Sequence, residues 1–318
     1  MRYSNLGEFF STGKEALAKG PIAIVFCEDE TEIASTLRHH LACGFAQILV
    51  LMQEDFLLAE DVADKVHRIN SPAPTTQVVQ ESINRLIEAA PGLWFYYCFN
   101  GEYLFFPFSE KRTVGEMLTF HTEERRDAML AYVIDLYAGD LTAHPDGVSL
   151  EDAYLDKSGY YALARPDASN NNYPKERQLD FFGGLRWRYE EHIPAARRKI
   201  DRISIFRAKP GLRLRDDHTF NDEEYNTYAC EWHHNLTAAV CSFRTAKALK
   251  RKEKPAPHVP YAARPAKAPV EEVRPDEIFK TRIPSEFEPA RADKIIATLL
   301  DGVSRSRVQK ALDLGMVK

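Results

Sequence analysis

The chain has 318 residues, of which 44% are hydrophobic and 28% are charged, and its formal net charge is −5. This composition excludes collagen-like, low-complexity and wholly disordered chains, and the length allows one large domain or two small ones. The acidic balance argues against a molecule that coats nucleic acid or an anionic membrane, so we expect no nucleic-acid partner.

The cysteine pattern and the absence of long apolar runs indicate the compartment. The 5 cysteines are widely spaced and form neither a C-x-x-C pair nor a disulfide framework, which is typical of buried thiols in a reducing environment. Residues 1–20 contain no continuous apolar run, and no run of about 18 apolar residues follows. We therefore expect a cytoplasmic protein with no signal peptide and no transmembrane segment.

Residues 22–52 have the pattern of a β-α-β unit. The continuous apolar runs within 22–26 and 47–52 predict two buried parallel strands. Between them, apolar spacing predicts a helix over 30–43, with Asp29 and Glu32 at the spacing of a capping box. Such a unit places the loop after each strand at one edge of the sheet, where ligands usually bind.

The following elements continue the alternation of helix and strand. Residues 75–89 have helical spacing, and the aromatic runs 94–98 and 104–106 are typical of strands. A helical stripe predicts a long helix over 122–137, and 203–207 is a further strand. We predict an α/β fold with a mostly parallel sheet flanked by helices, in which the first, second and third strands are neighbours.

The end of the chain differs in composition from the rest. Residues 253–275 contain six Pro and five Ala among 23 residues, which favours an extended linker over packed structure. Residues 276–318 have helical spacing in two short stretches and predict a small helical tail. We therefore place the folded domain at 1–252.

Three carboxylates directly follow the first strand. Cys27 is followed by the carboxylates Glu28, Asp29 and Glu30, and this acidic turn is either a helix N-terminus that favours acids or a contact for sugar or ribose hydroxyls. The chain has neither G-x-G-x-x-G nor G-x-x-x-x-G-K-[ST], so Rossmann dehydrogenases and P-loop NTPases are not expected.

The same region resembles the opening of glycosyltransferase family 2-like proteins. The acidic turn is followed by a helix that ends in His40-Leu41-Ala42-Cys43-Gly44-Phe45 and then by a second strand, and 102–107 resembles the segment that carries the metal motif of that family. The resemblance covers residues 20–110 best and weakens toward 250. It implies a GT-A-like fold, a nucleotide-sugar donor and a divalent metal, Mg²⁺ or Mn²⁺, held by an Asp-x-Asp motif.

The metal motif departs from this family pattern. Phe99-Asn100-Gly101 stands where Asp-x-Asp is expected, so any ion would be held by Asn100 and Glu102, with His218 as a further ligand from the later part of the chain. The alternative is that Asn100-Gly101 forms a hairpin turn between two aromatic strands.

Residues 186–215 contain ten basic and three acidic residues, a local excess of +7 in an acidic protein. Such a concentration suits a diphosphate, and we expect Arg197 and Arg202, together with His233, to contact the donor. The alternative is a solvated helix face and an exposed strand edge.

An inverting transferase needs a carboxylate that takes the proton of the acceptor hydroxyl. The candidates are Asp152, Glu176 and Asp180, each of which could equally be an ordinary surface acid. The sequence thus favours a glycosyltransferase of the hexosyltransferase class that acts on a glycan, lipid-linked or protein acceptor. The alternative is a catalytically silent GT-A-like module that binds a nucleotide or glycan.

Overall fold

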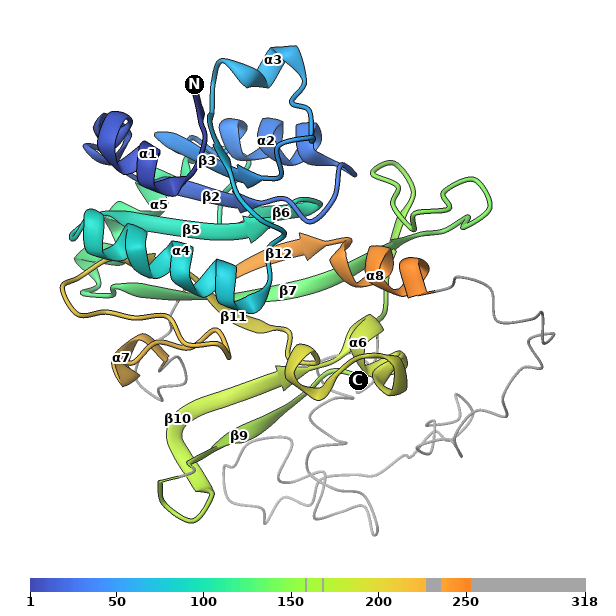
Figure 1. The fold of residues 1–318 in the computed structure, drawn as a ribbon. Helices are drawn as coiled ribbons and strands as arrows, with labels where there is room; N and C mark the ends of the chain where they lie inside the picture. The colour runs from blue at the N-terminus through green and yellow to red at the C-terminus, as the bar shows by residue number, and fades with distance from the viewer. Residues whose placement is uncertain (158, 168, 227–235, 253–318) are drawn as a thin grey trace, which may run out of the picture. The chain divides into compact units, whose positions relative to one another are not determined.

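A computed structural model describes residues 1–157, 159–167, 169–226 and 236–252 (Figure 1). Its centre is a ten-stranded sheet in the order β1-β4-β3-β2-β5-β11-β7-β12-β6, with β8 paired to β7. The strands of this sheet are β1 (Arg2–Tyr3), β2 (Ile22–Phe26), β3 (Gln47–Met52), β4 (His67–Asn70), β5 (Trp94–Phe99), β6 (Glu102–Phe105), β7 (Ala128–Ala138), β8 (Ala153–Leu155), β11 (Asp201–Arg207) and β12 (Ala238–Ser242).

The strands from β1 to β5 in this order are all parallel to one another, and β12 is parallel to β7. Strand β11 runs antiparallel to both β5 and β7, so those two strands point the same way. The carboxyl ends of β2, β3, β5, β7 and β12 therefore lie at one edge of the sheet. The predicted α/β class with a mostly parallel sheet is confirmed, and so are the neighbours β3, β2 and β5.

Helices cover both faces of the sheet (Figure 1). Strand β2 is completely buried, and its side chains alternate between two cores: Ile24 packs in one core with Ile83 of α4, and Val25 in the other with Leu37 of α2. This double burial is what a continuous apolar run in a parallel strand predicts. The α-helices are α1 (Leu6–Thr12), α2 (Ile33–Ala42), α3 (Glu60–Ala63), α4 (Thr76–Ala89), α5 (Val114–Glu123), α6 (Gly184–Arg188), α7 (Glu223–Asn226) and α8 (Arg244–Lys252).

A separate two-stranded antiparallel sheet is formed by β9 (Tyr161–Asp167) and β10 (Tyr173–Phe182). Its register places Tyr161 opposite Phe182, and the two rings stack with centroids 5.2 Å apart. Short 3-10 turns occur at Lys14–Leu17, Glu190–His192 and Ala195–Arg197. No helix among the described residues is long and apolar enough to cross a membrane.

The predicted helix over 122–137 is wrong, because α5 ends at Glu123 and β7 begins at Ala128. An apolar run of this length satisfies helical spacing and strand alternation at once. Pairing decides in favour of the strand, since β7 lies between β11 and β12 and buries Met129, Ala131 and Val133.

Two smaller predictions are also wrong. Helix α2 begins at Ile33 without a capping box, because Glu32 occupies the N-cap in a left-handed conformation (φ 62°) and makes no side-chain cap. The turn at Asn100-Gly101 is not a hairpin, because β6 pairs with β12 and not with β5. The predicted helix 75–89 and the strand 203–207 are confirmed as α4 and as part of β11. The predicted linker, 253–275, and tail, 276–318, lie outside the described residues.

Candidate functional site

The sheet has a topological switch point between β2 and β5. After β2 the chain builds β3 and β4 on one side, and β5 then lies on the other side of β2. At such a point the loops leave the sheet in opposite directions, and ligands of open α/β sheets bind outside the carboxyl ends of these strands. The predicted acidic turn after β2 and the Asn100-Gly101 turn after β5 meet here.

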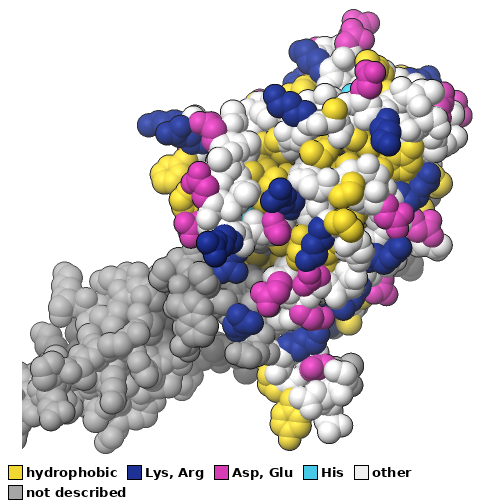
Figure 2. All heavy atoms as spheres, turned by 90° about the vertical axis from the view of Figure 1, so that its left-hand side faces the viewer, with side chains coloured by type: hydrophobic (Ala, Val, Ile, Leu, Met, Phe, Trp, Pro, Cys, Tyr) yellow, Lys and Arg dark blue, Asp and Glu magenta, His cyan; other side chains and the backbone are white. Residues whose placement is uncertain are grey.

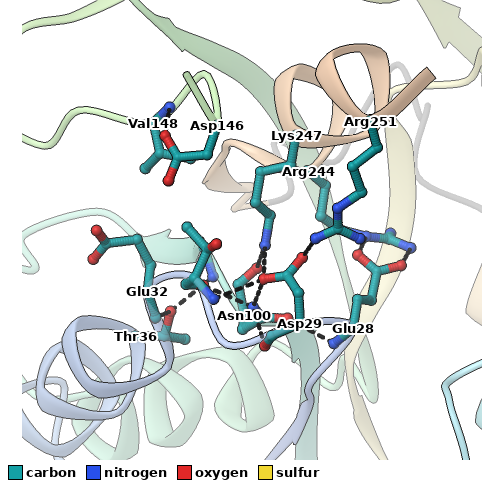
Figure 3. Close-up of polar contacts among 12 residues, drawn as sticks. Glu28, Asp29, Glu32, Thr36, Asn100, Asp146, Val148, Arg244, Lys247 and Arg251 are labelled. Carbon is teal, nitrogen blue, oxygen red and sulfur yellow. Dashed lines mark hydrogen bonds and ion pairs between the residues drawn. The ribbon is translucent and has the colours of Figure 1, made fainter. Parts of the chain in front are cut away.

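Asn100 joins the two loops with its side chain (Figure 3). Its Oδ1 accepts a hydrogen bond from the backbone N–H of Glu28 at 2.8 Å, and its Nδ2 donates to Asp29 Oδ1 and to the carbonyl of Thr31, each at 2.7 Å. Asn100 is fully buried. Asn100, predicted as a metal ligand, therefore positions the acidic turn.

Helix α8 supplies three cations to this turn (Figure 3). Arg244 donates two hydrogen bonds of 2.7 Å to the carboxylate of Glu28. Lys247 Nζ donates to Asp29 Oδ1 at 3.1 Å, and Arg251 also pairs with Asp29. The spacing i, i+3, i+7 puts these cations on one helix face. We call Glu28, Asp29, Arg244, Lys247 and Arg251 the switch-point cluster.

Burial and charge set the ionisation of this cluster. Burial alone would raise the pKa of Glu28, but the charge and hydrogen bonds of Arg244 lower it below its usual value. Burial lowers the pKa of Lys247 to about 8. Arg251 differs from Lys247 in access, because its side chain is 53% exposed and that of Lys247 only 3%. The cluster thus combines two carboxylates with cations at different depths.

A second ion pair lies deeper, beneath the end of β5. Arg202 NH2 lies 2.8 Å from Glu102 Oε2, and the side chains of both residues are buried. The N–H of Phe99 and the hydroxyl of Ser242 also donate to the Glu102 carboxylate. Burial alone would raise the pKa of Glu102, but Arg202 and Arg244 lower it to about 2. Arg202, which the sequence assigns to the donor, is therefore held inside the protein.

The residues predicted to bind a metal do not fit a divalent cation. The oxygen of Asn100 and the carboxylate of Glu102 already accept hydrogen bonds from the protein. His218 stacks on Tyr97, with Nδ1 3.0 Å from its hydroxyl, and burial followed by the charges of nearby arginines lowers the pKa of His218 to about 3. Within the described ranges, no three His, Cys, Asp or Glu side chains converge as a metal site.

The other predicted donor contacts are dispersed. Cys27 is buried, and burial raises the pKa of its thiol to about 12. Arg197 is exposed on a 3-10 turn, and His233 lies outside the described residues.

The basic excess of 186–215 is spread over several ion pairs. Arg186 binds Asp135, Arg213 binds Glu88, and Lys209 binds Asp222. On the face shown in Figure 2, basic side chains lie among acidic and apolar ones. The segment does not gather into a single anion site in the described part of the chain.

The three predicted catalytic carboxylates lie apart. Asp180 pairs with Arg165 at 2.8 Å and with Lys199 at 3.4 Å. Glu176 belongs to β10, and its side chain lies outside what the structure describes. Asp152 is exposed and precedes β8, which pairs with the carboxyl end of β7. Asp152 is therefore an accessible carboxylate beside the ligand edge of the sheet.

The sequence reasoning missed α8 and Asp135. Both oxygens of Asp135 accept hydrogen bonds from Arg186, at 2.9 and 3.2 Å, and Oδ1 also accepts from Thr245 of α8 at 2.9 Å. Helix α8 thus connects the end of β2 to the end of β7. The basic spacing of Arg244, Lys247 and Arg251 was the available signal for a charged helix face.

Comparisons with known proteins give no family assignment. No family model matches the chain, and no curated protein matches it. Among solved structures, the crystal structure of Staphylococcus aureus TarS has a TM-score of 0.24 and 13% identity, covering 36% of this chain and 21% of that one. TarS 1–349 in complex with UDP has a TM-score of 0.25 and 12% identity, covering 36% and 35%. The chain therefore matches about a third or less of the length of these structures.

Proposed function

We propose that this chain is a GT-A-type glycosyltransferase that binds a nucleoside diphosphate sugar at the switch-point cluster. The observation that carries the proposal is the meeting of α8 cations and loop carboxylates at the topological switch point of the sheet. A nucleoside diphosphate needs both kinds of group, because its phosphates bind cations and its ribose hydroxyls donate to carboxylates.

Binding would exchange one set of polar partners for another. The diphosphate would take Arg251 from Asp29 Oδ2, which would then accept a hydrogen bond from a ribose hydroxyl. The buried Lys247 would keep its bond to Asp29 Oδ1 and add its charge to the site. Each charged group keeps a partner throughout, which avoids the cost of a desolvated and unpaired charge. The half-exposed Arg251 is the group that an incoming phosphate would reach first.

The cations of α8 would neutralise the diphosphate without a divalent metal. This follows from the donor set, since Asn100 and Glu102 are committed to contacts within the protein. During transfer, the bond between the anomeric carbon and the diphosphate oxygen breaks and its electron pair leaves with the nucleoside diphosphate. The acceptor oxygen forms the new glycosidic bond, and its proton passes to a carboxylate. Asp152 is our candidate for that base because it is exposed near the end of β7.

A second candidate function is a catalytically silent module that binds a nucleotide or glycan. It is favoured by the pairing of Glu28, Asp29, Glu102 and Asp180 within the protein. An enzyme-coupled assay of nucleoside diphosphate release separates the two functions. The full chain is incubated with UDP-, GDP- and CDP-sugars, a panel of glycoside acceptors and a chelator. Acceptor-dependent release supports the transferase, whereas nucleotide binding without any release supports the silent module.

A further inference from the structure

Three half-exposed aromatic side chains surround the carboxyl end of β7. Tyr154, Tyr160 and Trp187 have exposed fractions of 52%, 41% and 46%. Tyr154 belongs to β8 and lies opposite Tyr137 in the register with β7. Trp187 belongs to α6, which is tied to β7 by the ion pair between Arg186 and Asp135. These three rings form the aromatic platform.

Each ring of the platform lies directly on a glycine. A Cβ atom added to Gly139 would come within 2.5 Å of Tyr154, one on Gly183 within 2.4 Å of Tyr160, and one on Gly159 within 2.4 Å of Trp187. Real Cβ atoms do not approach a ring so closely, so the rings can take these positions only because the underlying residues are glycines. The glycines support one side of each ring, and each of the three side chains keeps 41% to 52% of its surface exposed.

A buried carboxylate lies within the same group. Asp156 Oδ1 pairs with Arg188 at 2.6 Å and accepts a hydrogen bond from the Tyr137 hydroxyl at 3.2 Å. The side chain of Asp156 is only 3% exposed, and its Oδ2 has no hydrogen-bond partner among the described residues. An unpaired buried oxygen is costly, and in a native protein it often indicates a missing water or ligand.

Polar groups lie beside these rings. Arg188 is held by Asp156 while about half of its side chain remains exposed. Burial, followed by the charges of Asp135 and Asp156, raises the pKa of Tyr160, so its hydroxyl stays a neutral donor. Aromatic walls with a few fixed polar groups are the composition of a small-ligand site.

We infer that the aromatic platform binds a pyranose ring of a neutral glycan, whose C–H face stacks on Trp187 and Tyr160 and whose hydroxyls bind Arg188 and Asp156. The loop after β7 also packs against α8, since Gly147 contacts Ala246 and Lys250. The platform is thus connected to the switch-point cluster and would hold the acceptor sugar. This acceptor role rests on the proposed function, whereas sugar binding by the platform does not.

The test uses the full chain without nucleotide and a panel of methyl glucosides, galactosides, mannosides and N-acetylglucosaminides. Binding is followed by saturation-transfer NMR and calorimetry. At least one glycoside should bind saturably, and Trp187→Ala should weaken it about tenfold. Asp156→Asn should also weaken it. Tyr173→Ala is the matched control, because Tyr173 is 64% exposed and lies outside the platform.

Circular dichroism and thermal unfolding confirm that each variant is folded. The inference is overturned if no glycoside binds saturably, or if Tyr173→Ala weakens binding as much as Trp187→Ala. Occupation of the platform by another part of the chain would give the same negative result, because the wild type would then bind no glycoside. Glycoside binding without any transfer would support the platform and count against the transferase, so the two proposals fail separately.

Discussion

Two sets of carboxylate–cation pairs lie close together at the end of β5, and they differ in burial. The pair of Glu102 and Arg202 is enclosed, with side chains 0% and 6% exposed. In the switch-point cluster, the pair of Arg251 and Asp29 reaches the surface, because Arg251 is 53% exposed. The same chemistry therefore serves two purposes: an enclosed pair cannot exchange partners without a large cost, whereas a pair at the surface can.

The largest expected effect comes from breaking the enclosed pair. Arg202→Met would leave the Glu102 carboxylate buried without its cation and should lower the free energy of unfolding by about 3–5 kcal/mol. Urea denaturation measures this change. The double variant Glu102→Leu/Arg202→Met should recover much of the loss, because no unpaired charge remains. A single variant as stable as the wild type would show that the pair is not enclosed in solution.

The same pair predicts an acid-dependent loss of stability. The pKa of Glu102 falls from 4.5 to about 2 on folding, so its ionised form stabilises the folded state above about pH 4.5. This contribution, on the order of 3 kcal/mol, should be lost as the pH falls toward 2. Denaturation curves between pH 5 and 2 measure how the free energy of unfolding changes with pH, and Glu102→Gln should remove the part of this change that Glu102 causes. The same pH dependence in Glu102→Gln as in the wild type would show that Glu102 is not the group responsible.

Breaking the surface pair should change ligand binding and not folding. Arg251→Ala should weaken the binding of a nucleoside diphosphate by about tenfold to a hundredfold, through the loss of a charge-assisted hydrogen bond. Arg38→Ala is the matched control, since Arg38 of α2 is also 53% exposed and pairs with Asp61 of α3 at 2.7 Å. Calorimetric titration compares the two variants, and an equal effect of both would contradict a site at α8.

Lys247 adds a pH dependence to this binding. Because burial lowers its pKa to about 8, Lys247 loses its charge as the pH rises through that value. Nucleotide affinity should therefore fall above pH 8, by at most about tenfold per pH unit. Lys247→Met should bind more weakly at pH 7 and should show no such fall. If the nucleotide affinity of the wild type stays constant from pH 7 to 9, Lys247 does not contribute to phosphate binding.

The smallest expected effect is on the stability of the exposed pairs. Arg251→Ala and Arg38→Ala should both unfold at nearly the wild-type temperature, because exposed ion pairs contribute little to folding. Differential scanning calorimetry measures the two midpoints. A large fall in the unfolding midpoint of Arg251→Ala alone would mean that the contacts of Arg251 stabilise the fold.

How much of the fold could be predicted from the sequence depends on how far apart the contacting residues lie in the chain. The β-α-β unit of residues 22–52 could be predicted because its strands are continuous apolar runs that contact one another nearby in the chain. The α8 cations could not be assigned to Glu28 and Asp29, because they are more than 200 positions away in the sequence. The strand β7 was mistaken for a helix because only its neighbours β11 and β12 decide between the two patterns.

The site shows the same limit. The acidic turn and Asn100 were found because both directly follow strands, and loops after parallel strands meet at one edge. Their contacts were not predictable, since the side-chain amide of Asn100 looks like a degenerate metal ligand in the sequence and positions a loop in the structure. Arg202 likewise looked like a phosphate ligand until its burial against Glu102 was seen.

The proposed nucleoside diphosphate site at the switch-point cluster depends on the cations of α8. The most direct measurement is calorimetric titration of the full chain with UDP, GDP and CDP in the presence of a chelator, repeated with Arg251→Ala. At least one nucleotide should bind with a stoichiometry near one, keep its affinity in chelator and lose it in Arg251→Ala. Binding that requires Mg²⁺ or Mn²⁺, or that is unchanged by Arg251→Ala, would contradict a phosphate site built on α8.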